Sequence, residues 1–405
     1  MMNSIFFMTY NMLQLLLLLV IGIATLYIFI FSIAGIFYKQ KSLKISSKFR
    51  KIAVLIPGYK EDNVIVEVAG EALKQSYPAD KFDVVIIADS FQPETLISLR
   101  QLPIKVIEVS FDKSTKSKAL NKAMNQLTDY YDIAVILDAD NVMAYDFLEK
   151  INIAFESDFK AVQGHRAAKN LDNGLAVLDA VSEEINNHIF RKGHRVLGLS
   201  SAIIGSGMAF DYQYFKTMML SVTAIGGFDK EIELKMLKTG HKIEYLDNAM
   251  VYDEKVQKAD VFTNQRRRWL SAQFHYFRQD IVSAFIQLLS KGNVDYFDKA
   301  IQFIQPPRIL LLGTVTLLTI IFCTANILMN DFNQLTLSWI LIFEGCVLSF
   351  LLSIPHQYYS TTTAKALMEL PKGMILMMSS LLKIKGANKQ FLHTKHGSSN
   401  SNTTI

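Results

Sequence analysis

The chain has 405 residues, enough for about two or three structural units, and half of its residues are hydrophobic. The net charge is only +5, and the basic residues gather beside apolar segments instead of forming a stripe with interleaved aromatic residues, which argues against nucleic-acid binding. The two cysteines, Cys323 and Cys346, lie in apolar stretches, so a disulfide framework and a cysteine-based zinc site are excluded.

The N-terminal segment is apolar and carries no charge from Met1 to Tyr38. Residues 12–38 exceed the roughly 20 apolar residues that are needed to cross a bilayer. The segment lacks the basic leading end of a cleavable signal peptide, so a retained transmembrane anchor is predicted over a first unit of residues 1–50. Basic residues follow the anchor directly, namely Lys39, Lys41, Lys44, Lys48, Arg50 and Lys51. Because basic flanks stay in the cytoplasm, the next domain is expected on the cytoplasmic face of the cell membrane.

Residues 51–279 alternate short apolar runs with helical patterns, which is typical of an α/β domain. The apolar runs occupy residues 51–56, 82–88, 104–109 and 133–137. Continuous runs of this kind predict a mostly parallel sheet that is buried on both faces. Ligands of such sheets bind at the carboxyl ends of the strands. Asp89 and Asp138 are each the first polar residue after a run, so a nucleotide site is predicted beside them.

Residues 280–405 form the third predicted unit. Residues 309–329 and 335–354, the latter interrupted by Glu344, are long enough for two transmembrane helices joined as a hairpin. Residues 281–289 and 364–385 mix apolar and charged positions, which favours helices that lie in the membrane interface. The Ser/Asn/Thr tail from Ser398 is predicted to be disordered. The chain is therefore expected to be a multi-pass membrane protein.

The segment Asp138-Ala139-Asp140 places two carboxylates at a predicted strand end. Hard divalent cations prefer oxygen ligands and commonly bridge to the phosphates of a substrate. A cation held here would neutralise the charge that grows on a departing nucleoside diphosphate. The alternative is a solvated turn that contains two acids.

Three further segments could carry chemistry, each with a structural alternative. Lys116, with Lys118 and Asn121, could face a phosphate or a base, or could belong to a solvated helix face. Residues 226–234 gather acids at a helix start, where a carboxylate could remove a proton from a hydroxyl or simply favour the helix dipole. Residues 265–269, Gln-Arg-Arg-Arg-Trp, could bind phosphate and stack on a sugar ring, or could be a positive-inside cluster.

Taken in order, these motifs resemble those of the inverting nucleotide-sugar glycosyltransferases that include cellulose, chitin and hyaluronan synthases, the family 2 glycosyltransferases. The resemblance covers about residues 50–280. The matching segments are Pro57-Gly58-Tyr59-Lys60-Glu61 for the Pro-x-x-Asn-Glu turn, Asp89 for the nucleotide-binding aspartate, residues 115–121 for the Gly-Lys-x-x-Ala-Leu-Asn segment, Asp138-x-Asp140 for the metal motif, Gly205-Ser206-Gly207 for the acceptor segment, and Gln265-x-x-Arg268-Trp269 for the signature before the membrane.

The resemblance implies a GT-A-like nucleotide-sugar-binding domain. The nucleotide-sugar site that it implies consists of Pro57, Tyr59, Glu61, Asp89, Lys116, Asp138, Gln265 and Arg268. Asp140 would bind Mg²⁺ or Mn²⁺ through the diphosphate. The acceptor sugar would lie against Trp269 and the Gly205-Ser206-Gly207 segment.

The catalytic base is the least regular part of the resemblance. Where the family has Thr-Glu-Asp, this chain has Asp229-Lys230-Glu231. Glu231 falls at the position of the base, and a glutamate has a similar pKa and a longer reach than an aspartate. Asp229 is the alternative base. Either would deprotonate the acceptor hydroxyl as it attacks the anomeric carbon from behind.

The expected partners are a nucleotide sugar, a glycan or lipid-linked acceptor, and the membrane. The first expectation is the extension of a polysaccharide with a sugar from a UDP-sugar. Only about three spans are visible, which is few for a self-sufficient secretion channel, so a homo-oligomer or the addition of one sugar to a lipid are alternatives. A membrane scaffold with an inactive sugar-nucleotide domain is a third expectation, motivated by the altered base motif.

Overall fold

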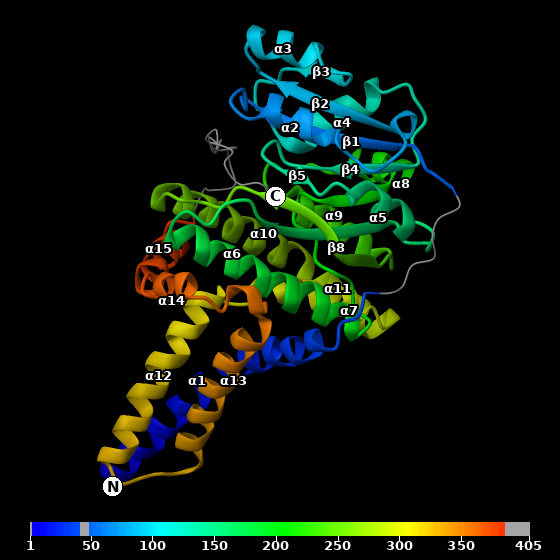
Figure 1. The fold of residues 1–405 in the computed structure, drawn as a ribbon. Helices are drawn as coiled ribbons and strands as arrows, with labels where there is room; N and C mark the ends of the chain where they lie inside the picture. The colour runs from blue at the N-terminus through cyan, green and yellow to red at the C-terminus, as the bar shows by residue number, and fades with distance from the viewer. Residues whose placement is uncertain (1, 41–47, 385–405) are drawn as a thin grey trace.

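The computed structural model describes residues 2–40 and 48–384. A sheet-containing domain lies above a stalk of long helices, and the N-terminus is at the far end of the stalk (Figure 1). Lys41 and Lys44 of the basic linker and the tail from Ser398 lie outside the described residues.

The domain is built on one eight-stranded sheet with the order β3-β2-β1-β4-β7-β6-β8-β5. The strands are β1 (Ile52–Tyr59), β2 (Phe82–Asp89), β3 (Lys105–Val109), β4 (Ile133–Ile136), β5 (Val142–Met143), β6 (Ala161–Ala168), β7 (Met208–Asp211) and β8 (Ile243–Asp253). The pairs of β1 to β4 are parallel, as are β6 and β8. Only β7 and β5 run antiparallel to their neighbours in this sheet. The mostly parallel sheet predicted from the sequence is confirmed.

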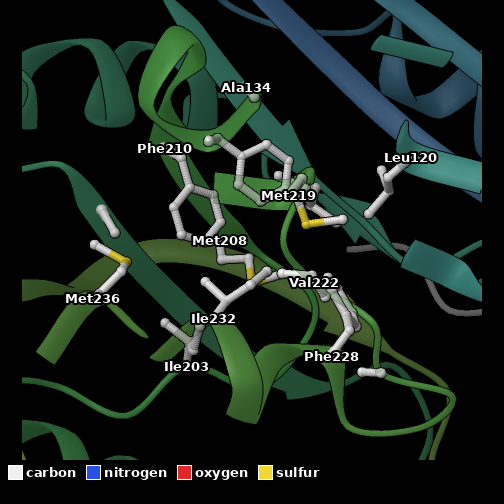
Figure 2. Packing of buried hydrophobic residues seen from close by; sticks show 14 of the residues in the cluster. Leu120, Ala134, Ile203, Met208, Phe210, Met219, Val222, Phe228, Ile232 and Met236 are labelled. Atoms are coloured by element: carbon white, nitrogen blue, oxygen red, sulfur yellow. The ribbon is translucent and has the colours of Figure 1, made fainter. Parts of the chain in front are cut away.

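Both faces of the sheet are covered, which explains the continuous apolar runs. In β1, Val54 and Ile56 join one hydrophobic cluster, whereas Ala53 and Leu55 join the other. Successive side chains of a strand point to opposite faces, so a strand covered on both sides has no polar alternation. Figure 2 shows the second cluster, in which Phe210 lies among residues of the neighbouring helices and loops.

Short helices cover the sheet around the strand ends. They are α2 (Ile65–Ala72), α3 (Pro93–Arg100), α4 (Lys116–Gln126), α5 (Phe147–Ala154), α8 (Tyr212–Met219) and α9 (Phe228–Lys238), with a 3₁₀ turn at Ala79–Lys81. Thr115, which replaces a glycine of the family pattern, is the N-cap of α4, and its side-chain oxygen accepts a hydrogen bond from the backbone N–H of Lys118 at 3.2 Å.

A second group of helices lies between the sheet and the stalk. These are α6 (Gly174–Asn186), which continues through the π-helical segment η2 (Asn187–Gly193) into α7 (His194–Val196), then α10 (Ala259–Lys291), α11 (Val294–Ile304), η3 (His356–Tyr358), α14 (Thr361–Leu367) and α15 (Leu370–Leu382). The expected division at residue 279 falls inside the 33-residue helix α10, which carries both the Gln-Arg-Arg-Arg-Trp motif and residues 281–289. The apolar segment 364–385 is broken into α14 and α15, and Pro371 lies in the first turn of α15, where its missing N–H is not needed.

Three helices of the described chain are long and apolar enough to cross a membrane. They are α1 (Met2–Ile36), α12 (Arg308–Leu328) and α13 (Gln334–Ser353), with candidate spans at Ile5–Ile36, Arg308–Leu328 and Gln334–Ser353. The three pack together as the stalk in Figure 1. Asn326 accepts a hydrogen bond from the Tyr10 hydroxyl at 2.7 Å and donates one to Thr336 at 2.8 Å. Such bonds favour helix association in a medium that offers no water to polar groups. Glu344 is exposed on the outside of α13.

Candidate active site

A cavity of about 460 Å³ lies at the carboxyl ends of β1, β2 and β4 and is also lined by α9 and α10. It brings together segments that are far apart in the sequence. The predicted site residues that line it are Pro57, Tyr59, Glu61, Asp89, Lys116, Asp138, Asp140, Gly205, Asp229, Gln265, Arg268 and Trp269. The predicted residues that do not line it are Ser206, Gly207 and Glu231.

The strand ends place the first group of polar side chains. Tyr59 and Asp89 are the last residues of β1 and β2 and are paired in register, so they emerge side by side. Asp89 is 2% exposed, and one of its carboxylate oxygens accepts a hydrogen bond from the Ser90 hydroxyl at 2.9 Å. Asp138 follows β4, which pairs with the other edge of β1. This is the location that the sequence predicted for the nucleotide site.

The segment Gly205-Ser206-Gly207 fastens the acidic turn to the sheet. The Ser206 hydroxyl accepts a hydrogen bond from the Asp138 backbone N–H at 2.9 Å and donates one to the Asn141 side chain. Both glycines have positive φ, +81° for Gly205 and +62° for Gly207, a conformation that residues with a Cβ rarely adopt. Of the three residues predicted at the acceptor site, Gly205 lines the cavity, whereas Ser206 and Gly207 do not, and Ser206 holds the turn instead.

Lys116 links Asp138 to the Gly205-Ser206-Gly207 segment. At the first turn of α4, its ammonium donates hydrogen bonds to a carboxylate oxygen of Asp138 and to the Gly205 carbonyl, the latter at 2.7 Å. The side chain therefore lies inside the site instead of on a solvated face. Lys118 instead donates to the Lys113 carbonyl at 2.9 Å.

Asp140 offers carboxylate oxygens to the cavity but cannot hold a metal ion with protein ligands alone. The carboxylate is 8% exposed and accepts two long hydrogen bonds, from the Asn141 amide at 3.1 Å and from the Glu254 backbone N–H at 3.4 Å. No group of three His, Cys, Asp or Glu side chains suited to a metal ion occurs within residues 2–40 and 48–384. Mg²⁺ typically takes one or two protein carboxylates and completes its shell with phosphate oxygens and water. The donor set fits an ion that arrives with a diphosphate.

The structure separates the two candidates for the catalytic base. The Glu231 carboxylate accepts hydrogen bonds from the backbone N–H groups of Thr223 and Ala224, at 3.2 and 2.9 Å, and lies 2.7 Å from the Lys235 ammonium. It closes the loop before α9 and does not face the cavity. The geometry therefore favours Asp229 over Glu231 as the base, and the role of either acid stays a prediction. Asp229 lines the cavity next to Gly205. The two acids differ in this way because side chains two positions apart on a helix point in different directions.

Helix α10 presents one face to the cavity. Gln265, Arg268 and Trp269 line it at the spacing i, i+3, i+4, and Ala272 extends the face by one turn. Burial lowers the pKa of Arg268, although an arginine remains charged in a protein. The side-chain oxygen of Gln265 is buried and has no hydrogen-bond partner within the described residues.

Arg266 supports this face from outside the cavity. Its guanidinium lies 4.3 Å from the centre of the Trp269 ring and forms an ion pair with Asp179 of α6. The motif thus divides between residues that face the cavity and one that holds the tryptophan in place.

A group of buried ion pairs that lines the cavity was not predicted from the sequence. Arg166 of β6 donates a hydrogen bond to Glu183 of α6 at 2.8 Å and lies 3.4 Å from Asp253 at the end of β8. All three line the cavity. Burial raises the pKa of Asp253 to about 6, although Arg166 and Lys255 lower it. The only sequence signal is the presence of charged residues in elements that are otherwise buried.

A second buried ion pair also lines the cavity. Lys299 of α11 lies 2.7 Å from Glu233 of α9, and both line the cavity. The two residues come from segments with no common motif, so only the packing of α11 on α9 brings them together.

A family profile described as "Glycosyltransferase like family 2" matches residues 50–272, more than half of the chain. The chain belongs to this family. The resemblance noted in the sequence is thereby confirmed, and the cavity lies within the matched residues, apart from Gln273 and three residues of α11.

Two curated relatives of this family 2 chain differ in their named products. The chain is 24% identical over 243 residues to a beta-monoglucosyldiacylglycerol synthase from Synechocystis sp., which covers 56% of this chain and 49% of that protein. It is 29% identical over 121 residues to a glucans biosynthesis glucosyltransferase H from Rhodopseudomonas palustris, which covers 27% of this chain and 17% of that protein. The chain thus spans about half the length of the first relative and less of the second.

A solved structure with the same fold is the mannosyltransferase PcManGT from Pyrobaculum calidifontis in complex with GDP-Man and Mn²⁺. The superposition has a TM-score of 0.54 at 17% identity and covers 92% of this chain and 97% of that chain. At this identity the likeness shows the fold. The domain is GT-A-like, and the chain combines this domain with three candidate membrane spans within the described residues.

Proposed function

We propose that the protein is an inverting hexosyltransferase that uses a nucleotide sugar, a UDP-sugar in the first instance, and adds one sugar to a lipid on the cytoplasmic face of the cell membrane. The observation that carries the proposal is a single cavity shared by Asp140, Asp229 and Arg268. An acid for a metal ion, an acid for a proton and a cation for a diphosphate are the groups that this transfer needs.

The strand ends suit the donor. Asp89 is buried at the cavity wall, and its carboxylate accepts one hydrogen bond within the described residues, from Ser90, so it can accept another from the edge of a base. Asp138 and Lys116 form the adjacent charged pair, where the sugar–diphosphate region would lie. Asp140 would hold Mg²⁺ or Mn²⁺, which when bound neutralises charge on the diphosphate. The PcManGT complex with GDP-Man and Mn²⁺ supports a divalent ion.

The side chains of α9 and α10, which form the helical wall of the cavity, suit the chemical step. Asp229 takes the proton of the acceptor hydroxyl as that oxygen bonds to the anomeric carbon. The bond from this carbon to the diphosphate oxygen breaks on the opposite side, its electron pair leaves with the diphosphate, and the configuration inverts. Arg268 and the amide N–H of Gln265 stabilise the departing diphosphate. Trp269 offers an aromatic face to the acceptor head group.

A lipid acceptor is preferred over the polysaccharide that the sequence favoured first. The relative named as a beta-monoglucosyldiacylglycerol synthase matches over 56% of this chain. Three candidate spans are few for a channel that would carry a polysaccharide out of the cell. Polysaccharide extension remains the second candidate, and the relative named glucans biosynthesis glucosyltransferase H favours it.

The test is product analysis with purified full-length protein in nanodiscs that contain diacylglycerol. Radiolabelled UDP-sugars and GDP-mannose are supplied with Mg²⁺ or Mn²⁺, and lipid-soluble and water-soluble products are separated. The proposal predicts a lipid that carries one sugar with the anomeric configuration opposite to that of the donor. Long water-soluble chains would instead establish the polysaccharide function. No transfer or hydrolysis of any donor would support the inactive scaffold.

A further inference from the structure

A second cavity, of about 340 Å³, lies where the catalytic domain meets the stalk. We call it the apolar cleft. It is lined by Ile21 of α1, Leu270, Gln273 and Phe274 of α10, Phe303 and Ile304 of α11, Gln305, Pro306 and Pro307 of the following turn, Leu310, Leu311 and Thr314 of α12, and Met378 and Leu381 of α15. None of these residues is charged. The lining suits hydrocarbon.

The apolar cleft lies next to the catalytic cavity. Gln273 and Phe303 line both cavities, so the two meet between α10 and α11. Helix α10 serves both, because Trp269 faces the catalytic cavity and the next residue, Leu270, faces the cleft. A ligand with a polar head and an apolar tail could therefore occupy both spaces at once.

The apolar cleft also lies at the end of a candidate membrane span that is nearer to the sheet domain. Its lining includes the first two turns of α12, whose candidate span begins at Arg308. In Figure 1 this end of α12 lies beside α15, below the sheet domain, and the helices pack against each other. Ile304 and Met378 are each 45% exposed, so the cleft has open sides at the level where the stalk would enter the bilayer.

We infer that the apolar cleft binds an acyl chain of the acceptor lipid, while the hydroxyl of its head group reaches Asp229 past Gln273 and Phe303. A peptide is a poor occupant, because its many backbone N–H and C=O groups need more partners than the side chains of Gln273, Gln305 and Thr314 supply. The inference rests on the proposed lipid acceptor.

Filling the apolar cleft should separate long-chain from short-chain acceptors. Leu310→Trp and Thr314→Trp place bulk one turn apart on the cleft side of α12, and neither residue is fully buried. Each should lower kcat/KM for dioleoylglycerol at least about tenfold, the scale on which apolar pockets discriminate. Activity on water-soluble dibutyrylglycerol should change by less than about twofold. Leu317→Trp on the same helix, 59% exposed, is the matched control and should affect neither acceptor.

A second measurement reads the site without turnover. Full-length protein in nanodiscs is irradiated with a diacylglycerol that carries a diazirine in its acyl chain, and the cross-linked peptides are identified by mass spectrometry. Cross-links should map to the cleft helices α10 and α12 and should decrease in Leu310→Trp. Equal loss of activity on both acceptors, no loss on either, or cross-links confined to the outer surface of the stalk would overturn the inference. Cross-linking in the cleft without any lipid product would retain the site and reject the lipid acceptor.

Discussion

The catalytic cavity has two walls that are built in different ways. The strand-end wall carries short acids, Asp89, Asp138 and Asp140, whose positions follow from the strand register and from one serine that fastens the turn. The helical wall carries longer side chains on α9 and α10, such as Arg268 and Trp269, whose positions depend on packing against other helices. The strand-end wall is therefore set by the sheet, and the helical wall by the packing of the helices.

The largest expected effect comes from the base on the helical wall. Asp229→Asn removes the proton acceptor and should lower kcat by about 10²–10⁴-fold. Glu231→Gln should retain activity within a few-fold, because its carboxylate acts on the loop before α9. Initial rates of sugar transfer at saturating donor measure both, with size-exclusion profiles as the check on folding. If Glu231→Gln abolishes transfer while Asp229→Asn does not, the two acids have been assigned the wrong way round.

The strand-end wall should show the next largest effect. Asp140→Asn removes the carboxylate that would hold the metal ion and should reduce transfer on the order of 10²–10³-fold, the scale of losing one group that stabilises a developing charge. Excess chelator should reduce wild-type activity, and Mn²⁺ or Mg²⁺ should restore it. Mn²⁺ binding in the presence of UDP, followed by electron paramagnetic resonance, gives a readout apart from turnover. Tight UDP-dependent Mn²⁺ binding by Asp140→Asn would remove Asp140 from this role.

Substitution of Arg268 tests whether transfer needs the planar guanidinium or only a positive charge at this position of the helical wall. Arg268→Lys keeps the charge and loses the planar pair of N–H donors, so it should lower kcat/KM by about 10–100-fold, the value of hydrogen bonds to a charged group. Arg278→Lys, an exposed position on the same helix, is the matched control. Equal kinetics of the two variants would mean that Arg268 does not grip the diphosphate.

The smallest expected effect concerns the pH dependence of the stability of the fold. Burial lowers the pKa of His165, but Asp247 and Glu184, which face its two ring nitrogens at 2.9 and 3.0 Å, outweigh burial and raise it to about 9. The stabilisation is complete below the unfolded value near 6.5 and is lost as the pH rises through 9. The shift corresponds to at most about 3 kcal/mol. Thermal unfolding in detergent should show stability falling from pH 6.5 to 9 in the wild type and less in His165→Gln. If stability falls equally with pH in the wild type and in His165→Gln, His165 is not the group that causes this pH dependence.

The strand-end wall could be predicted from the sequence because its signal is local. A continuous apolar run marks each strand, the first acid after it marks the strand end, and parallel strands end at one edge. Gln265, Arg268 and Trp269 were also predictable, because a helical spacing of three and four residues sets their common face.

The remainder of the site depends on contacts between distant segments. The sequence left both Asp229 and Glu231 open as the base, because the backbone N–H groups of Thr223 and Ala224 and the Lys235 ammonium, which hold Glu231 away from the cavity, have no sequence signal. The buried Arg166–Glu183 and Lys299–Glu233 pairs have no motif, because their partners meet only through packing. For the same reason no sequence motif predicts the apolar cleft, because its lining comes from five different helices.

The central claim is that one cavity holds the diphosphate of a nucleotide sugar between the two walls. A structure of the full chain with UDP and Mn²⁺ tests it most directly, with the ion located by its anomalous signal. We predict the ion within about 2.0–2.3 Å of an Asp140 oxygen and of the diphosphate, a range near that of hard divalent cations, with Arg268 on the diphosphate from the other side. A diphosphate bound away from Asp140, or an Arg268 that faces a separate space, would contradict the account.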